Sequence, residues 1–232
     1  MATSISLNKY ISSTGVCSRR EADRWIEAGR VTLNGTTASK GNRVVAGDRV
    51  LIDGRLLTER PRAVYLAFHK PAGVTSTTDR SDPDNIIDYI GYPERIFPIG
   101  RLDKASTGLL LLTNDGDVVN KILRVEHAHE KEYIVGVDRP VTEVFLRRMA
   151  SGVPILGTTT ESCTVERLGK RRFRIVLTQG LNRQIRRMCK YLGYGVLTLK
   201  RIRIMDIHLG DLPVGSYRVL DPAKELAKVI NR

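Results

Sequence analysis

Hydrophobic residues in the first 55 positions recur first at helical and then at strand spacing. The helical part predicts two short amphipathic helices, one that ends at Gly15 and one from Ser18 to Gly29. Ser18 and Glu21 have the spacing of a capping box, in which the serine accepts a hydrogen bond from the helix start and the glutamate reaches back. A glycine at the end of the second helix favours a left-handed cap. The outward face of this helix carries three arginines: Arg19, Arg20 and Arg24.

Short apolar and β-branched segments follow the second helix and predict strands. They occupy residues 31–33, 44–45 and 50–52, with turns at Asn34-Gly35 and Asp53-Gly54. Two helices plus a small sheet, with arginines on an exposed helix face, indicate a docking module rather than an enzyme.

Beyond residues 59–62, which read as a linker, strands outnumber helices and do not alternate strictly with them. This pattern is typical of the α+β class with a mixed, largely antiparallel sheet. The predicted strands are residues 64–68, 108–113, 133–137, 163–166, 172–178, 196–199 and 203–209. The predicted helices are residues 117–123, 142–150, 182–192 and 223–230. The sequence therefore predicts two domains, a small one at residues 1–60 and a mixed-sheet domain at residues 63–232.

Charge separates the chain into distinct regions. The formal net charge is +13 and the sequence pI is about 10.0, which indicates a polyanionic partner. Residues 167–203 hold twelve Lys or Arg and no Asp or Glu, and residues 1–62 hold eleven basic against six acidic residues. Residues 63–166 are net acidic. Two separate basic regions suit nucleic acid better than a basic face kept only for solubility.

Other classes of protein lack support in the sequence. No apolar run approaches the roughly 18 residues of a membrane span, and the N-terminus does not resemble a signal peptide. Cys17, Cys163 and Cys189 cannot all pair and form no CxxC, which favours a reduced, cytoplasmic setting. His127 and His129 lack further ligands at zinc-site spacing, so no metal is expected. Neither a Walker loop nor a GxGxxG is present, so no cofactor is expected. A monomer is the default expectation.

One carboxylate stands out in the segment of residues 97–109. Asp103 lies in a stretch bounded by glycines, and the neighbouring Arg101 and Lys104 should keep it ionised, as a nucleophile or base requires. Taken alone, the stretch fits a turn with a surface aspartate at least as well.

The predicted helix at residues 182–192 is strongly amphipathic. At about 100° per residue, its apolar positions share one face, and Arg186 lies at the border of that face, where its long side chain can reach a cleft. The other basic residues point away from the apolar face and are expected to meet phosphate: Arg183, Arg187 and Lys190.

The N-terminal stretch "LNKYISSTGVCSRREADRWIEAGRVTLNGTTASKGNRVVAGDRV" resembles the S4 RNA-binding domain. The resemblance implies that the helix bearing Arg19, Arg20 and Arg24 contacts structured RNA. A generic helical cap on the larger domain is the alternative.

Four motifs further along the chain resemble those of pseudouridine synthases that carry an S4 domain. They are "HKPAGVTSTT", "GRLDKASTGLLLLT", "HEKEY" and "LTQGLNRQIRRMC". The resemblance implies that Asp103 is the catalytic carboxylate and that Arg186 pairs with it. It also implies that Tyr133 stacks on the target base and takes a proton, and that Arg101 fills the space left by the extracted base. Without the motif, Tyr133 would read as a core residue of a strand.

This family isomerises uridine to pseudouridine in folded RNA, without metal or cofactor. The resemblance implies a large-subunit ribosomal RNA substrate, free or in an assembling particle, and a tyrosine transfer RNA as a second substrate. Small-subunit ribosomal RNA is the alternative substrate. A non-catalytic RNA-binding or ribosome-assembly factor and an RNA base hydrolase are the alternative functions.

Overall fold

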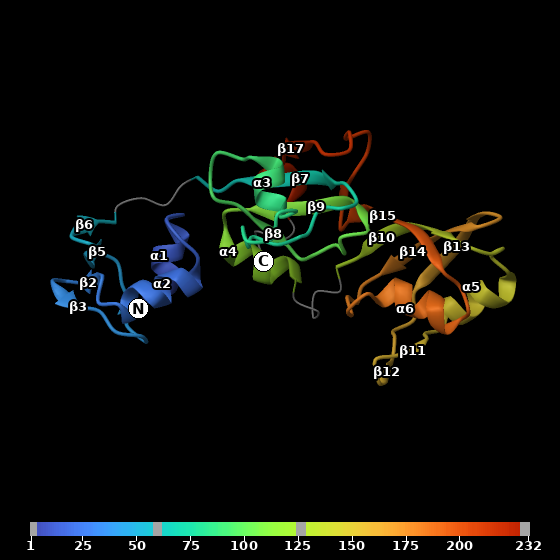
Figure 1. The fold of residues 1–232 in the computed structure, drawn as a ribbon, viewed down its shortest axis with the longest axis horizontal. Coiled ribbons are helices and arrows are strands. Elements are labelled where there is room, and N and C mark those ends of the chain that lie inside the picture. Colours follow the sequence, from blue (N-terminus) through green and yellow to red (C-terminus); the bar gives the residue numbers. More distant parts are fainter. Residues whose placement is uncertain (1–3, 58–61, 124–128, 228–232) are drawn as a thin grey trace. The chain divides into compact units, whose positions relative to one another are not determined.

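The computed structural model describes residues 4–57, 62–123 and 129–227 (Figure 1). Its internal contacts divide the chain into two compact units. The N-terminal unit comprises residues 1–63 with the short segments 93–95 and 114–116. The larger unit comprises residues 64–92, 96–113 and 117–232. Of the predicted linker at residues 59–62, only Arg62 lies within the described residues.

The N-terminal unit contains the two predicted helices and a small sheet. The helices are α1 (Leu7–Ser13) and α2 (Arg19–Glu27). The sheet has the order β3-β2-β5-β6, and a separate strand pair joins β1 to β4. The strands are β1 (Ile5–Ser6), β2 (Val31–Leu33), β3 (Thr36–Thr37), β4 (Arg43–Val44), β5 (Val50–Ile52) and β6 (Arg55–Leu56).

Local signals fix the boundaries of α2 and the turn that follows. The Ser18 hydroxyl accepts a hydrogen bond of 3.1 Å from the Glu21 backbone, which confirms the predicted N-cap. The Glu21 carboxylate pairs with Arg24 instead of reaching back, so the second half of the capping box is not formed. Gly29 has a φ of +70° and ends the helix as predicted. Asn34 and Gly35 both have positive φ, as their two-residue hairpin requires.

The larger unit is built on a mixed sheet, which confirms the predicted fold class. Within the described residues the sheet has nine strands, in the order β13-β14-β10-β15-β9-β7-β17, with β8 attached to β9 and β16 attached to β15. All of these neighbours are antiparallel except β9 and β15, which run parallel. The strands are β7 (Tyr65–Lys70), β8 (Phe97–Ile99), β9 (Thr107–Thr113), β10 (Lys131–Val137), β13 (Thr164–Gly169), β14 (Arg172–Leu177), β15 (Val196–Ile204), β16 (Ile207–His208) and β17 (Tyr217–Val219).

The predicted break between residues 199 and 203 is wrong, because β15 runs without interruption from Val196 to Ile204. Its charged interior residues have partners inside the sheet, which sequence patterning does not show. Arg201 lies opposite Tyr133 in the ladder with β10, and Arg203 donates to Glu132 over 2.6 Å and to Glu130 over 2.8 Å. Because these arginines have partners in neighbouring segments, the strand continues through positions where charged residues would otherwise suggest that it ends.

Five helices accompany the sheet within the part of the chain that the structure describes. They are α3 (Ile86–Ile90), α4 (Gly116–Leu123), α5 (Glu143–Ala150), α6 (Gln184–Tyr191) and α7 (Pro222–Glu225). The helix predicted at residues 223–230 is shorter than expected, with α7 ending at Glu225 and residues 228–232 outside the described part. Helix α3 and strand β8 were not predicted, and a small hairpin of β11 (Pro154–Ile155) and β12 (Thr158–Thr159) is a further addition.

Both faces of the central strands are buried, which explains the apolar run of β9. Leu110 and Leu112 join one core cluster with residues of β10, β14 and α6, whereas Leu109 and Leu111 join a second cluster with residues of α4. At the start of β9, Gly108 has a φ of +111°, and a Cβ there would lie 2.2 Å from the Arg201 carbonyl oxygen. Only glycine allows β9 and β15 to approach so closely.

Candidate active site

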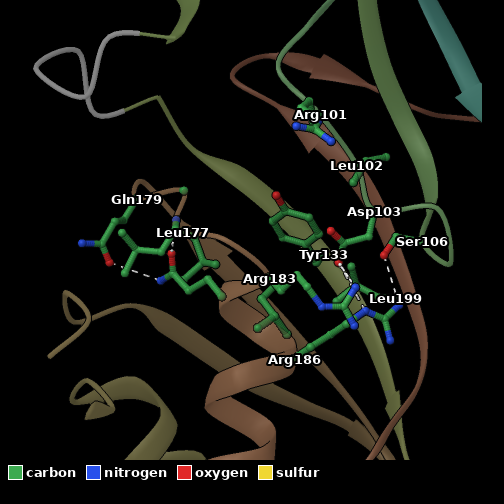
Figure 2. Close-up of a pocket in the computed structure, with 14 residues that line it drawn as sticks. Arg101, Leu102, Asp103, Ser106, Tyr133, Leu177, Gln179, Arg183, Arg186 and Leu199 are labelled. Atoms are coloured by element: carbon green, nitrogen blue, oxygen red, sulfur yellow. Dashed lines mark hydrogen bonds and ion pairs between the residues drawn. The ribbon is translucent and has the colours of Figure 1, made fainter. Parts of the chain in front are cut away.

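A pocket opens where the segment before β9 meets β10 and α6 (Figure 2). The space between its lining residues, open solvent at the mouth included, is about 470 Å³. The predicted residues that line it are Arg101, Asp103, Tyr133, Arg183 and Arg186. Residues far apart in the sequence thus converge on one cavity.

Asp103 lies between two guanidinium groups. Its Oδ2 is 3.5 Å from Arg186 Nε and 3.3 Å from Arg183 Nη1, and its side chain is 29% exposed. Figure 2 shows both arginines directed at this carboxylate. Two cations thus face one carboxylate oxygen of Asp103 inside the pocket.

Arg186 is held in place by groups of the surrounding backbone and loop. Its Nη2 donates to Ser106 Oγ at 3.1 Å and to the Ala105 carbonyl at 3.3 Å, and its Nη1 lies 3.5 Å from the Val196 carbonyl. Its side chain is only 15% exposed. The prediction that Arg186 reaches a cleft along the apolar border of its helix is therefore confirmed in geometry.

Arg183 does not lie where the helical periodicity predicted. The helix begins only at Gln184, and Arg183 precedes it with a φ of +49° and a ψ of +36°, in the left-handed region. This backbone conformation turns the side chain toward Asp103 instead of placing it on the outer face with Arg187 and Lys190. The prediction that Arg183 belongs to the helix and points away from its apolar face is wrong, because the residue precedes the helix.

Lys70 is a fully buried cation beneath the segment that carries Asp103. Its Nζ donates to the carbonyls of Pro71 at 2.8 Å, Ser106 at 2.9 Å and Lys104 at 3.3 Å. Burial lowers the pKa of Lys70 to about 8, and the charge of Asp103 partly opposes that shift. These hydrogen bonds from Lys70 thus stabilise the turn that follows Asp103.

Tyr133 is buried on β10 and still lines the pocket. Behind it, the Arg201 guanidinium lies 6.0 Å from the centre of its ring. Arg201 Nε donates to the Leu109 carbonyl at 2.7 Å, and its buried Nη2 has no hydrogen-bond partner among the described residues. The Arg201 cation and the Tyr133 ring thus lie within the distance of a cation–π interaction.

The remaining predicted residues of the larger unit are Arg101, Arg187 and Lys190. Arg101 is exposed and lines the pocket, as Figure 2 shows. Arg187 donates to Asn182, with its Nε 3.0 Å from the carbonyl and its Nη2 3.1 Å from Oδ1. Lys190 is exposed on the outer side of α6. Neither Arg187 nor Lys190 is among the residues that line the pocket.

On α2, the predicted RNA-binding arginines are all exposed. Arg19 and Arg20 leave most of their surface to solvent, whereas Arg24 is engaged by Glu21. Elsewhere among the described residues, no group of His, Cys, Asp and Glu could hold a metal ion, and His127 lies outside them. Within the same residues, no helix combines the length and apolarity needed to cross a membrane.

Two residues that hold the site were not singled out from the sequence. Ser106 and Lys70 are both completely or almost completely buried, and both act on the segment after Asp103. Each lies within a motif quoted above, yet a lone serine or lysine in a loop motif does not indicate a structural role. A lysine at the end of a mostly apolar strand is the one signal that could have marked Lys70.

A family model described as RNA pseudouridylate synthase matches residues 64–191, and the S4 domain model matches residues 6–58. The chain belongs to the RNA pseudouridylate synthase family, in the branch that carries an S4 domain. It is an RNA pseudouridine synthase.

Curated relatives and a solved structure agree with this assignment. The chain is 55% identical to the "Dual-specificity RNA pseudouridine synthase RluF" of Salmonella typhi, covering 98% of this chain and 80% of that protein. It is 34% identical to the "Ribosomal large subunit pseudouridine synthase B" of Bacillus subtilis, covering 93% and 92%. A crystal structure of a pseudouridylate synthase superposes with a TM-score of 0.70 at 29% identity, covering 96% of this chain and 98% of that one.

Proposed function

We propose that this synthase modifies a uridine of large-subunit ribosomal RNA and that a tyrosine transfer RNA is a second substrate. The name of the Bacillus relative specifies the large ribosomal subunit, and the name of the Salmonella relative specifies dual specificity. In this proposal residues 1–60 dock the RNA and residues 63–232 carry out the reaction. Small-subunit ribosomal RNA has no comparable support among these relatives.

Asp103 is the proposed catalytic carboxylate. Pseudouridine formation breaks the N1–C1′ bond, turns the uracil and joins C5 to C1′, so the sugar passes through an electron-deficient state. An ionised carboxylate can capture or stabilise that state. The supporting observation is that Asp103 is the one carboxylate among the residues that line the pocket. A hydrolase that released the base would need a second, protonated carboxyl group beside the leaving base.

Tyr133 and Arg186 are the proposed partners of Asp103. After C5 bonds to C1′, the C5 proton must leave, and the Tyr133 hydroxyl is the candidate acceptor, directly or through water. Arg186 orients the carboxylate, because its own position is fixed by Ser106 and two carbonyls. Loss of either member of such a buried pair strands the other, at a cost on the order of 3–5 kcal/mol.

The target uridine must leave its stack to reach the pocket, which costs a few kcal/mol. In the proposal Arg101 occupies the vacated space, and Arg183, Arg187 and Lys190 bind phosphates around the mouth. Arg19, Arg20 and Arg24 of the N-terminal unit add contacts to folded RNA. Such contacts act through charge, so they should make binding strongly dependent on salt.

The test is tritium release from transcribed large-subunit ribosomal RNA labelled at uracil C5. The wild-type protein should release tritium and Asp103→Asn should not. A matched control is Asp84→Asn, which removes a carboxylate that pairs with Lys104 at 2.6 Å but does not line the pocket. This control should retain turnover close to that of the wild type.

Other outcomes would each point to a different conclusion. Turnover by Asp103→Asn would remove Asp103 from the chemistry. Free uracil among the products would indicate hydrolysis rather than isomerisation. Release from tyrosine transfer RNA or small-subunit RNA, but not from large-subunit RNA, would correct the substrate assignment and leave the site unchanged.

A further inference from the structure

One oxygen of the Asp103 carboxylate lies near the guanidinium groups of two arginines in the pocket. Asp103 Oδ2 lies 3.3 Å from Arg183 and 3.5 Å from Arg186, and both distances exceed the roughly 2.7–2.9 Å of a charge-assisted hydrogen bond. The Nε of Arg186 is buried and makes no hydrogen bond to any described residue. Asp103 therefore lies between two cations and forms a short, charge-assisted hydrogen bond with neither of them.

The two arginines differ in how firmly they are held. Arg186 is 15% exposed and has three other acceptors. Arg183 is 49% exposed, and among the described residues its guanidinium has Asp103 as its one ion-pair partner. An exposed pair of this kind is weak and easily exchanged. Arg186 is thus a fixed partner of the carboxylate, and Arg183 is a partner that can be withdrawn.

The backbone of Arg183 favours this exchange. A non-glycine residue in the left-handed region stores strain of about 1 kcal/mol or more, and such strain gathers at functional sites. Here it directs a long cationic side chain into the pocket from the mouth, where substrate must enter. The same side chain, turned outward, would reach the surface occupied by Arg187 and Lys190.

Resting on the proposed role of Asp103, we propose that Arg183 is a positioning residue that changes partner when RNA binds. In the structure it pairs with Asp103. When the flipped uridine enters, its phosphate competes for the guanidinium, and Arg183 moves from the carboxylate to the phosphate. Asp103 then closes on the buried Nε of Arg186 and faces the sugar. The entering substrate thereby frees the group that attacks it.

A binding cycle tests this exchange without requiring turnover. RNA affinity is measured by filter binding to transcribed large-subunit ribosomal RNA, with excess poly(A) to suppress non-specific contacts. If Arg183 must leave Asp103 in order to bind RNA, Asp103→Asn should tighten binding about fivefold, the upper range for such an ion pair. The gain should fall below about twofold when Arg183→Gln is also present, because no competition remains to be removed.

Arg187→Gln is the matched control, because it removes the same charge four residues away without touching Asp103. In that background the gain from Asp103→Asn should remain about fivefold, because Arg183 is still present and still has to leave the carboxylate. Arg183→Lys should restore most of the gain, because it keeps a cation within reach. In turnover, Arg183→Gln should change KM far more than kcat.

An equal effect of Asp103→Asn with and without Arg183 would overturn the proposal, as would a loss of kcat in Arg183→Gln without a change in KM. These outcomes are independent of the proposed function. If Asp103→Asn retained tritium release, the catalytic assignment would fail, and the binding cycle would still report whether Arg183 exchanges.

Discussion

Helices α2 and α6 carry similar sequence patterns and use them differently. Both are short and amphipathic, and both begin next to a run of arginines. Helix α2 starts at a serine whose hydroxyl accepts from the Glu21 backbone, and its arginines project to solvent as periodicity predicts. Helix α6 has no side-chain cap, and the residue before it adopts a left-handed conformation that turns Arg183 inward.

The difference shows that the start of a helix can decide what its arginines do. On α2 an ordinary cap leaves the three arginines exposed, on the surface that we propose holds folded RNA. On α6 the irregular start and the buried border position direct two cations at one carboxylate. The first arrangement supports binding, and the second supports chemistry.

The largest effect is expected from Arg186→Gln. It removes a fixed guanidinium from a preorganised site, and such losses lower kcat by about 10²- to 10³-fold. Tritium release under saturating RNA measures the effect. Arg187→Gln on the same helix should keep kcat within about threefold of the wild type, because Arg187 contacts Asn182 and not Asp103, and saturating RNA compensates for a lost phosphate contact. Similar losses in both variants would mean that α6 acts through its overall charge.

The buried Lys70 should make stability depend on pH. Its pKa is about 8 in the folded chain, below the ordinary 10.5, so between these values the unfolded chain binds more protons. The free energy of unfolding should therefore rise with pH across this window, by on the order of 3 kcal/mol from this residue. Urea unfolding from pH 7.5 to 10.5 measures it, with Lys70→Met as the variant that lacks the rise. Parallel curves for the two proteins would contradict a buried charge at Lys70.

Removing the exposed cations of α2 should weaken binding and leave chemistry intact. Arg19→Gln with Arg20→Gln should reduce the slope of log affinity against log salt by about 1–2, close to one unit per lost phosphate contact. The kcat should stay unchanged. Lys40→Gln is the control, because this exposed lysine of the same unit is already paired with Glu27. An unchanged slope in the double variant would show that α2 does not hold RNA.

The smallest expected effect is a difference in stability between substitutions at the starts of α2 and α6. Ser18→Ala should lower the stability of the N-terminal unit by about 1 kcal/mol, because the helix loses its cap. Trp25, the one tryptophan of the sequence, reports unfolding of this unit by fluorescence. Asn182→Ala, beside α6, should cost less than about 0.5 kcal/mol, because Asn182 contacts Arg187 and does not cap the helix. Equal losses of stability in the two variants would show that the starts of α2 and α6 do not differ in their capping.

Much of this architecture could be predicted from local signals. The caps of α2, the Asn34-Gly35 hairpin and most strands of the larger unit follow from residues within a few positions of one another. The position of Arg186 followed from helical periodicity, because it depends on one face of one helix. Its partner Asp103 could be named only through the resemblance to a family, since loop aspartates are common.

What escaped prediction depends on contacts between distant segments. Strand β15 continues through Arg201 and Arg203 because β10 supplies partners, and no window of sequence contains both. Arg183 was misplaced because a single left-handed residue shifts the helix start by two positions. Lys70 and Ser106 act through carbonyl groups and a hydroxyl that come together only in the folded chain.

The parallel contact between β9 and β15 consists of two residue pairs, Thr107 with Lys200 and Gly108 with Arg201. Asp103 lies just before β9, whereas Tyr133 and α6 belong to the half of the sheet that contains β15. The isomerisation rate should therefore report whether the two halves of the sheet remain joined. A protein warmed until this narrow junction opens would stop isomerising uridine while most of its helices and strands persist. A methyl group added at Gly108 should lower the temperature at which that happens.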